Sequence, residues 1–417
     1  MQLKRVVITG LGGITPLGNS VTEFWNNLIK GVSGAANITR FNAEKFKTRF
    51  ACEVKGFNIE DYFDKKEARK LDAYSQYGIA ASVQAVADSG IAADSIDKNE
   101  VGVIWGSGIG GLDTFQAEAF GFAKGDGTPR FNPFFIPKMI ADICSGHISM
   151  RFGFRGPNFT TVSACASSTN ALIDSFTYIR MGKANAIVTG GSEAAINECG
   201  IGGFNACQAM STRNESPETA SRPYDKDREG FVLGEGGVAI ILEELEHAKA
   251  RGAKIYAEII GGGMSGDAHH ITAPHPDGLG AKLVMQRALK DAEVNPNEVD
   301  YINTHGTSTP LGDIAELKAI ETLFGEQAFK MNISSTKSMT GHLLGAAGAL
   351  EAMATVLAVQ NDIVPPTINF TTTDPEINPR FNLTFNKAVA RKINIAISNT
   401  FGFGGHNAAV VLKKYVA

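Results

Sequence analysis

The chain is 417 residues long, carries a formal net charge of −4, and is 43% hydrophobic and 20% charged. Such a composition excludes a disordered chain, and the near-neutral total argues against nucleic acid as a general partner. At roughly 150 residues per domain, the length predicts two or three domains or one large duplicated domain.

No segment predicts export or membrane insertion. The apolar run at residues 6–8 is too short for a signal peptide, and the most apolar helical stretch, residues 343–360, carries Glu351 in its middle. The five cysteines include no C-x-x-C pair, which argues against disulfide and zinc scaffolds and favours a reducing compartment. We therefore expect a soluble, cytoplasmic protein with no membrane partner and no metal.

Short apolar strands alternate with helices along the chain, which predicts an α/β fold of layered sheets and helices. Most of the strands lack clean alternation, as expected for strands covered on both faces. The expected strands are residues 4–9, 101–105, 186–189, 238–242, 299–303, 393–398 and 408–412. The clearest expected helices are residues 73–87, 281–291 and 343–360.

The order of the elements indicates an internal duplication. A helix, a polar connector, a strand and a small-residue loop follow one another at residues 84–108, and the same order returns at residues 286–307. Residues 187–192 are echoed at 397–402. We therefore predict two related halves, residues 1–250 and 251–417.

A glycine-rich loop at residues 106–111 fits G-x-G-x-x-G and follows a strand. In a dinucleotide site an acidic residue follows about 20 residues later, at a strand end, but Asp126 lies in a loop composition. A second near-match at residues 10–15 lacks the last glycine. Tight turns that let backbones pass closely are the preferred interpretation, and a nicotinamide oxidoreductase stays as an alternative that predicts cofactor binding.

Cys165 is the strongest single candidate for chemistry. It follows a β-branched run at residues 158–162 and precedes a patch of small residues that begins a helix. A helix N-terminus favours the thiolate and predicts a lowered thiol pKa, and its free N–H groups can stabilise an oxyanion. The alternative is a buried structural cysteine.

Two histidines occur in similar loops of the second half. His305 follows a strand, and His342 lies between a short strand and the apolar helix. Together with Cys165 they form a plausible thiol-acylation site. His269 and His270 are adjacent and are interpreted as loop or surface residues, and the absence of G-x-S-x-G disfavours a serine hydrolase of the α/β type.

These residues lie in motifs that span the whole chain. They include residues 6–12, the segment around Cys165, Ser221-Arg222-Pro223-Tyr224-Asp225, residues 230–236, both histidine loops and residues 398–407. In all of them the chain resembles the β-ketoacyl-acyl-carrier-protein synthases, most closely the elongating type of type II fatty acid synthesis. The resemblance implies a thiolase-type fold with five αβαβα layers and two duplicated halves.

The resemblance also implies a mechanism for an acyltransferase. Cys165 would carry the acyl chain as a thioester, and the N–H groups of Cys165 and Phe401 would form the oxyanion hole. His305 and His342 would donate to the enolate left when malonyl-carrier protein loses carbon dioxide, giving a 3-oxoacyl chain two carbons longer. Lys337 and Glu351 would form a charged pair near the histidines, and no cofactor is implied.

Further roles are implied at matched positions. Thr307 and Thr309 would bind the phosphopantetheine arm, Phe401 would act as a gate on a flexible glycine loop, and Asp267 would restrain the partnering loop. Ile109 would line the acyl pocket at a homodimer interface. Phe403 and Glu351 are placed with the substrate-binding residues.

An acidic acyl carrier protein is the implied partner, and it needs a basic docking surface. The candidates are Lys65, Lys66, Arg69 and Lys70, with Arg130 in addition, and Gln208 departs from the arginine that related enzymes often carry. Two alternatives stay open. One is a ketosynthase of a polyketide or aryl-polyene pathway with the same chemistry, and the other is a non-catalytic acyl-chain binder.

Overall fold

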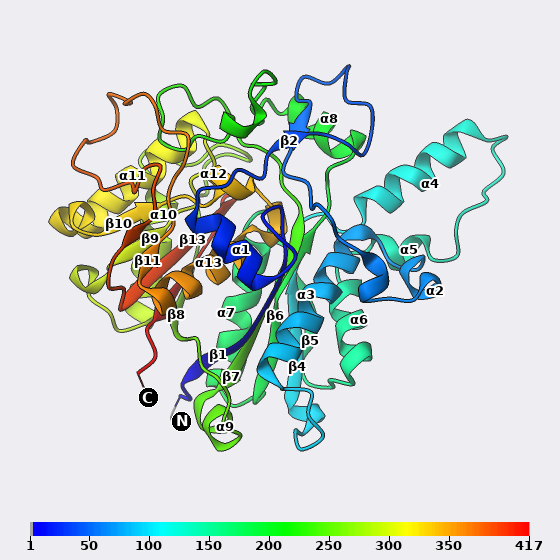
Figure 1. The fold of residues 1–417 in the computed structure, drawn as a ribbon, viewed down its shortest axis with the longest axis horizontal. Coiled ribbons are helices and arrows are strands. Elements are labelled where there is room, and N and C mark those ends of the chain that lie inside the picture. Colours follow the sequence, from blue (N-terminus) through cyan, green and yellow to red (C-terminus); the bar gives the residue numbers. More distant parts are fainter. Residues whose placement is uncertain (1–2, 417) are drawn as a thin grey trace.

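Ten strands pair into one continuous sheet in the computed structural model, which describes residues 3–416 (Figure 1). Their order across the sheet is β10-β9-β13-β14-β8-β1-β7-β6-β4-β5. The bounds are β1 Val6–Ile14, β4 Val101–Gly106, β5 Asn158–Thr161, β6 Ala186–Glu193, β7 Gly236–Glu244, β8 Ala257–Gly266, β9 Tyr301–Asn303, β10 Asn332–Ser334, β13 Ile395–Gly402 and β14 His406–Lys413.

The sheet consists of two five-stranded sets with the same topology. The first set has the spatial order β5-β4-β6-β7-β1, and the second has β10-β9-β13-β14-β8. When the five strands of each set are numbered along the chain, both spatial orders are 3-2-4-5-1. The sets join where β1 and β8 pair antiparallel, with Val6 opposite Ile259. This repeated order confirms the duplication. The boundary at residue 250 stays a prediction; it falls at the end of the short helix α9 (Leu245–Ala250).

Helices form three layers around the two strand sets. On β7, Val238, Ile240 and Leu242 pack in the central cluster with α7 (Ser167–Arg180) and α13 (Ala347–Asn361), whereas Ala239 and Ile241 face α3. One outer layer holds α3 (Ala73–Ser89) and α6 (Ile143–Phe152), and the other holds α10 (Leu279–Asp291) and α11 (Pro310–Phe324). The expected five-layered α/β fold is therefore confirmed, and strands buried on both faces explain the weak alternation.

Two glycines show how closely the outer helices approach the strands. A Cβ on Gly12 in β1 would lie 2.0 Å from the carbonyl oxygen of Ala81 in α3, and a Cβ on Gly263 in β8 would lie 2.3 Å from that of Val284 in α10. The glycines near residue 12 therefore serve close helix packing within a strand. The same requirement explains why β8 was not predicted, since its glycines interrupt the apolar run.

The remaining elements are short and lie mostly at the rim. They are α1 Val21–Ile29, α2 Lys65–Ala68, α4 Leu112–Lys124, α5 Phe135–Met139, α8 Glu198–Ala206, α12 Lys337–Thr340 and the strand pairs β2 Ala36–Asn37 with β3 Phe50–Ala51 and β11 Ile363–Val364 with β12 Val389–Ala390. The α4–α5 segment projects from the body (Figure 1). The helix expected at residues 343–360 begins as a 3₁₀ turn, Leu344–Ala346, before α13. Within residues 3–416, no helix is both long and apolar enough to cross a membrane.

Candidate active site

A cavity of about 370 Å³ contains most of the residues that the sequence analysis selected. Both halves of the chain contribute to its lining. Cys165 comes from the first half, and the second half contributes His305, His342, Thr307, Thr309, Asp267, Phe401 and Phe403. The structure thus brings together the thiol and both imidazoles, which lie far apart in sequence.

Cys165 lies in a strained turn between β5 and α7. The preceding Ala164 has φ +50°, a left-handed conformation that costs a non-glycine residue about 1 kcal/mol or more. Its carbonyl accepts hydrogen bonds from the N–H and the hydroxyl of Ser167, at 3.2 and 2.7 Å, which hold the turn. A Cβ on Gly402 would lie 2.9 Å from the Ser163 carbonyl oxygen and 3.1 Å from the Cys165 nitrogen, so the close passage of that loop over the thiol favours glycine.

The thiol is less acidic than its place near a helix N-terminus predicted. Burial raises the pKa of Cys165 to about 12, although the N–H of Phe403 and the charge of Lys337 act in the opposite direction. The expectation of a lowered pKa is therefore wrong for the free protein, because desolvation of the thiolate outweighs the amide donors. Cys165 is a neutral thiol at pH 7 and must lose its proton during attack.

The backbone amide directed at the thiol belongs to Phe403. This amide opposes the burial-driven rise in the pKa of Cys165, and the amide of Cys165 itself acts in the same direction. Phe401, whose amide the resemblance places in the oxyanion hole, lies two residues earlier, and its ring faces His305 with ring centroids 5.5 Å apart.

His305 and His342 meet edge to face, with ring centroids 5.2 Å apart and planes at 87°. Burial lowers the pKa of both imidazoles well below the usual value, and the charge of Lys337 lowers both further. Both rings are consequently neutral at pH 7, and each carries one N–H. Glu316 fixes the His305 loop, because its carboxylate accepts the N–H groups of His305 and Gly306 at 3.0 and 2.9 Å.

Lys337 and Glu351 form a buried ion pair behind the histidines. The Lys337 Nζ lies 2.7 Å from Glu351 Oε2, and their side chains are 1% and 0% exposed. Burial raises the pKa of Glu351 to about 7, and Lys337 opposes that rise. Glu351 does not line the cavity. Its placement among the substrate-binding residues is therefore corrected: the structure makes it the partner of Lys337.

Replacing Lys337 with methionine is expected to destabilise the fold by about 3–5 kcal/mol at pH 9, because an ionised carboxylate is then left buried without a partner. A carboxyl whose pKa is raised on folding binds more protons in the folded state, so stability falls as pH rises between its unfolded value near 4.3 and its folded value. Loss of Lys337 raises the folded pKa above its present value of about 7. The stability deficit against the wild type should therefore be larger at pH 9 than at pH 6.

Denaturant unfolding at both pH values measures this difference. The double variant Lys337→Met/Glu351→Gln is the control, because a neutral pair should recover most of the stability and remove the pH dependence. An equal loss at pH 6 and pH 9 in the single variant would contradict the argument.

The other expected substrate residues lie on loops at the cavity. The hydroxyls of Thr307 and Thr309 are 3.1 Å apart, and both residues line the cavity. Asp267 ties two loops together: its N–H donates to the carbonyl of Gly405 at 3.0 Å, and its Oδ1 accepts from Asn407 Nδ2 at 2.8 Å. Ile109 does not line this cavity and is 38% exposed in the single chain.

Glu193, at the end of β6, explains the glycine-rich loop that resembled a nucleotide site. Its buried carboxylate accepts the N–H groups of Gly108, Ile109 and Gly110, at 2.8, 3.1 and 3.2 Å, and that of Gly345 at 3.0 Å. The amides that would bind a phosphate therefore already bind a side chain of the protein. A lone glutamate at a strand end gave no signal for this role in the sequence.

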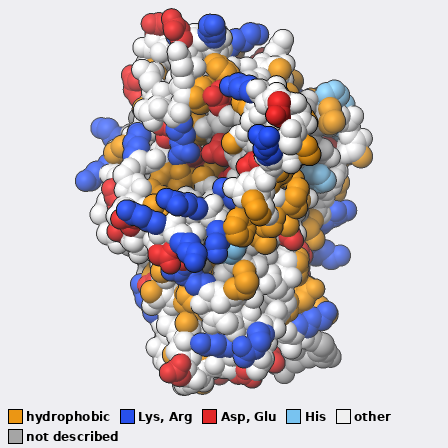
Figure 2. All heavy atoms as spheres, turned by 90° about the vertical axis from the view of Figure 1, so that its right-hand side faces the viewer, with side chains coloured by type: hydrophobic (Ala, Val, Ile, Leu, Met, Phe, Trp, Pro, Cys, Tyr) orange, Lys and Arg blue, Asp and Glu red, His pale blue; other side chains and the backbone are white. Residues whose placement is uncertain are grey.

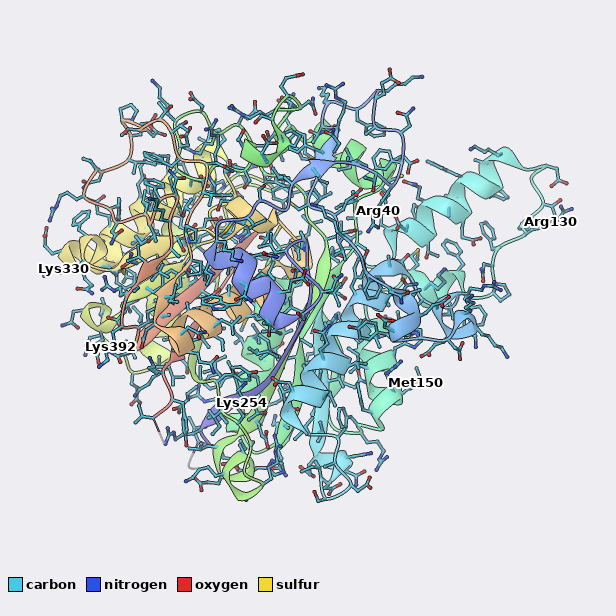
Figure 3. All side chains as sticks on the ribbon, viewed as in Figure 1. Arg40, Arg130, Met150, Lys254, Lys330 and Lys392 are labelled. Carbon is cyan, nitrogen blue, oxygen red and sulfur yellow. The ribbon has the colours of Figure 1, made fainter. Side chains whose placement is uncertain are left out.

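The basic docking candidates are exposed, and all but Arg130 lie together on and directly after α2. Lys66 lies on α2 and Arg69 and Lys70 follow it, with the Lys70 Nζ 5.5 Å from the ring centroid of Phe134 at the start of α5. Arg130 lies at the outer end of the α4–α5 segment (Figure 3). His269 and His270 are exposed. Among residues 3–416, no group of three or more His, Cys, Asp or Glu side chains is arranged to hold a metal ion.

Comparison with known proteins assigns the chain to a family. It matches the models described as Beta-ketoacyl synthase, N-terminal domain, over residues 3–248 and Beta-ketoacyl synthase, C-terminal domain, over residues 256–371. A 3-oxoacyl-(acyl-carrier-protein) synthase 2 of Staphylococcus aureus strain COL is 48% identical over 416 residues, covering 100% of both chains. One of Synechocystis sp. is 47% identical over 415 residues, covering 100% of this chain and 99% of the relative.

Solved structures agree with these relatives. A β-ketoacyl synthase from Burkholderia phymatum has a TM-score of 0.92 at 36% identity, covering 99% of this chain and 100% of its own. A type II polyketide ketosynthase bound to a hexaketide, in complex with its acyl carrier protein, has a TM-score of 0.90 at 32% identity and covers 100% of both chains. Family models spanning most of the sequence, and relatives matched along their full length, show that this chain belongs to the β-ketoacyl synthase family.

Proposed function

We propose that the protein is the elongating condensing enzyme of fatty acid synthesis. It joins malonyl-acyl carrier protein, with loss of carbon dioxide, to an acyl chain held on Cys165, and yields a 3-oxoacyl-acyl carrier protein two carbons longer. The observation that carries the proposal is the meeting of Cys165 with two neutral imidazoles, His305 and His342, in one cavity. The full-length relatives named 3-oxoacyl-(acyl-carrier-protein) synthase 2 support the same activity.

Acyl transfer is the first step. The sulfur of Cys165 attacks the thioester of an acyl-carrier protein, the bond to the pantetheine sulfur breaks, and the thiol proton passes to that leaving sulfur. The N–H groups of Cys165 and Phe403 stabilise the oxyanion, since the Phe403 amide already points at the sulfur. The transfer exchanges one thioester for another, so it needs no external proton or energy source.

Condensation is the second step. The malonyl group loses carbon dioxide, and the enolate oxygen that forms accepts hydrogen bonds from His305 and His342. The enolate carbon attacks the thioester carbon on Cys165, the carbon–sulfur bond breaks, and the released thiolate takes up one proton from water. Neutral imidazoles suit this role because each can present an N–H without a full charge in a buried site. Decarboxylation drives the reaction, so we propose that no cofactor is needed.

The remaining cavity residues bind the substrate arm and control access. Thr307 and Thr309 donate to or accept from the phosphopantetheine arm, with Asp267 restraining the neighbouring loop. Phe403 lies within the glycine loop at residues 402–405, and Phe401 directly precedes it. Gly404 and Gly405 in this loop have positive φ values that favour glycine. We assign the gate that admits the acyl chain to this loop.

A homodimer belongs to the same proposal. The edge strand β5 ends one side of the sheet, and the α4–α5 segment, which projects from the body, carries exposed apolar side chains. They are Phe115, Phe120, Phe122, Phe131, Phe134 and Ile136, each at least 41% exposed. Such a large apolar surface favours a partner, and a second copy would also cover Ile109, where it would limit acyl chain length. Sedimentation equilibrium tests the dimer, and a monomer would contradict it.

An acyl carrier protein docks, in this proposal, beside α2. Figure 2 shows Lys and Arg side chains gathered next to an apolar area on this face. Reversing the charges of Lys66, Arg69 and Lys70 to glutamate should raise KM for carrier-bound substrates about tenfold, because these groups attract an acidic partner. Steady-state kinetics at low and high salt measure the effect, which screening should reduce.

The control reverses three exposed lysines of the second half, Lys318, Lys330 and Lys392. Lys330 and Lys392 lie on the opposite side of the molecule from Arg130 (Figure 3). The two triple variants change the net charge equally, so a difference in KM between them reports a local docking site rather than the total charge. Equal KM values for both would remove the docking surface from the proposal.

A cytoplasmic location is part of the proposal, since all five cysteines are free thiols and suit a reducing compartment.

The second candidate function is a ketosynthase of a polyketide or aryl-polyene pathway. The likeness to a polyketide ketosynthase at a TM-score of 0.90 favours it. It uses the same steps and differs in the acyl chain, so acyl preference separates the two.

Mass spectrometry of intact protein and products tests the proposal. The enzyme is mixed with a medium-chain acyl-carrier protein, and malonyl-carrier protein is then added, with Cys165→Ala as the control. An acyl adduct on Cys165 followed by a ketoacyl product two carbons longer is the expected result. An adduct without product would contradict the condensation step, and no adduct from folded protein would favour the acyl-chain binder.

A further inference from the structure

The segment Ser221–Arg228, mostly buried, contacts the two loops that carry His305 and His342, although it does not line the site around Cys165. The Ser221 hydroxyl donates to the carbonyl of Lys337 at 2.8 Å. The N–H of Arg222 donates to the Ser308 hydroxyl at 3.0 Å, and the Tyr224 hydroxyl lies 2.5 Å from that of Thr304. These contacts connect the segment to both histidine loops.

Ser308, between the two cavity threonines, is held in a strained conformation. It has φ +69°, which is unfavourable for a residue with a Cβ. All three of its hydrogen-bonding groups are fixed: its N–H donates to Asp313 at 3.2 Å, its hydroxyl accepts from Arg222, and its carbonyl accepts from the N–H of Gly230 at 3.0 Å. The strain persists because the surroundings determine it, and it aims Thr307 and Thr309 into the cavity.

Arg228 stabilises this loop from below. Its side chain is 4% exposed and donates to the carbonyls of Thr309 and Pro310, at 3.3 and 2.9 Å. The guanidinium also contacts Asp313 at 3.5 Å and Asp374 at 2.6 Å. It also donates to the carbonyl of Asp225 at 2.8 Å. One planar fork therefore spans three carbonyls and two carboxylates, a geometry that lysine cannot reproduce.

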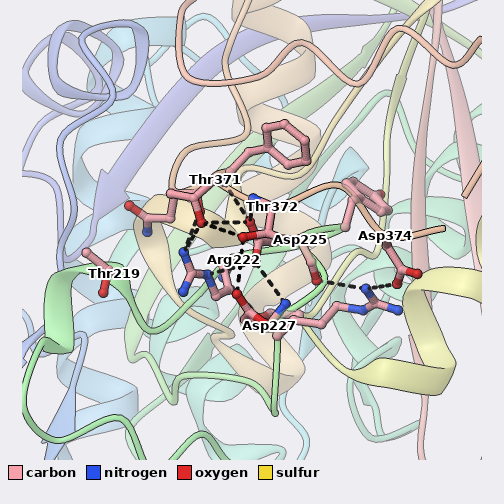
Figure 4. A network of polar contacts seen from close by, with 12 residues as sticks. Thr219, Arg222, Asp225, Asp227, Thr371, Thr372 and Asp374 are labelled. Atoms are coloured by element: carbon pink, nitrogen blue, oxygen red, sulfur yellow. Dashed lines mark hydrogen bonds and ion pairs between the residues drawn. The ribbon is translucent and has the colours of Figure 1, made fainter. Parts of the chain in front are cut away.

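A second polar layer fixes the outer side of the segment. Figure 4 shows Arg222 and Asp225 joined to Thr371 and Thr372, through the backbone of both threonines and the hydroxyl of Thr371. Asp225 accepts the N–H groups of those threonines at 2.6 and 2.8 Å, and Arg222 donates to the Thr371 hydroxyl at 2.9 Å. Hydrogen bonds thus hold both sides of the segment, and they fix the backbone position of Arg228.

We infer that Arg228 is a positioning residue, which holds the Thr307–Thr309 loop in the strained form that receives the phosphopantetheine arm. This inference rests on the proposed function, because it assigns the loop to that arm. No hydrogen bond joins Arg228 to the Cys165 turn, which is held by Ser167 instead. Its loss should therefore weaken use of carrier-bound substrates and leave the thiol itself unchanged.

The test is Arg228→Lys, which keeps the charge and loses the fork. We expect KM for acyl- and malonyl-carrier protein to rise about tenfold, since small misplacements of positioning groups have large effects. Alkylation of Cys165 by iodoacetamide should stay within about twofold of wild type. The matched control is Arg180→Lys: Arg180 also forms a close pair, with Asp291 at 2.8 Å, but lies at the far end of α7, about 20 Å along the helix from Cys165.

Ser308→Gly is the second variant, and it serves if Arg228→Lys does not fold. Glycine accepts the left-handed backbone, so the fold should survive, but the loop gains freedom and loses its hydroxyl anchor. KM should rise severalfold with an unchanged melting temperature. Unchanged KM in either folded variant, or slower Cys165 alkylation in proportion to lost activity, would overturn the inference. A wild-type enzyme that forms no product would instead reject the proposed function.

Discussion

Cys165→Ala is expected to abolish condensation, with a loss of at least about 10³-fold, while malonyl-carrier protein is still decarboxylated. Loss of a covalent nucleophile removes the whole acyl-enzyme route. His305 and His342 are untouched by the change, and they face the same cavity. Without an acyl thioester to attack, the enolate takes a proton, so the malonyl group ends as an acetyl group and carbon dioxide.

Two products measure this outcome separately. Mass spectrometry should show no adduct and no ketoacyl product, and the acetyl-carrier protein should accumulate. Cys207→Ala is the matched control, because Cys207 lines the same cavity and is exposed. It should keep both activities. A Cys165→Ala enzyme that still elongates acyl chains would contradict the role of the thiol, and loss of decarboxylation in that variant would show that the two steps are not separable.

The fold was largely readable from the sequence where burial leaves a pattern. Strands such as β7 are apolar on both sides, because one face packs on α7 and α13 and the other on α3. A continuous apolar run is the expected signature of such a strand. By contrast, β8 was missed, since Gly263 is required by the close approach of α10 and a glycine-rich segment does not resemble a strand.

The members of the site were also predictable, but their exact contacts were not. Cys165, His305 and His342 stand in recognisable loops, whereas Phe401 and Phe403 occupy equivalent places in a repeated Phe-Gly pattern. Only the path of the backbone over the thiol decides which amide points at the sulfur, and it is that of Phe403. The pKa of Cys165 was mispredicted for a related reason: local sequence shows the helix start but not the burial that raises the pKa.

Some contributors left no signal at all. Glu193 and Glu316 are buried carboxylates that bind backbone amides of loops 85 and 11 residues away in sequence. A single glutamate in a sequence has no pattern, and its partners are defined only when the strands and helices assemble. Arg228 is of the same kind, since its role follows from carbonyls that a different loop presents.

His305→Ala and His342→Ala are expected to stop the reaction after the first step. Each substitution removes one hydrogen-bond donor to the enolate oxygen, and loss of such a donor costs about 10²–10³ in rate. The two rings lie 5.2 Å apart, close enough to serve one oxygen atom between them. The double variant should therefore lose little more than the worse single variant, because both donors act on the same charge.

Acyl-enzyme should accumulate in these variants, and release of carbon dioxide should fall together with condensation. His247→Ala is the matched control. His247 lies on α9, where its Nδ1 is 2.6 Å from a carboxylate oxygen of Glu243 in β7, and it does not line the cavity. It should keep full activity. If the histidine variants failed to load an acyl chain at a normal rate, the imidazoles would act on Cys165 rather than on the enolate, and their place in the second step would be lost. The expected result is normal acyl loading without decarboxylation, which would place both imidazoles in the condensation step alone.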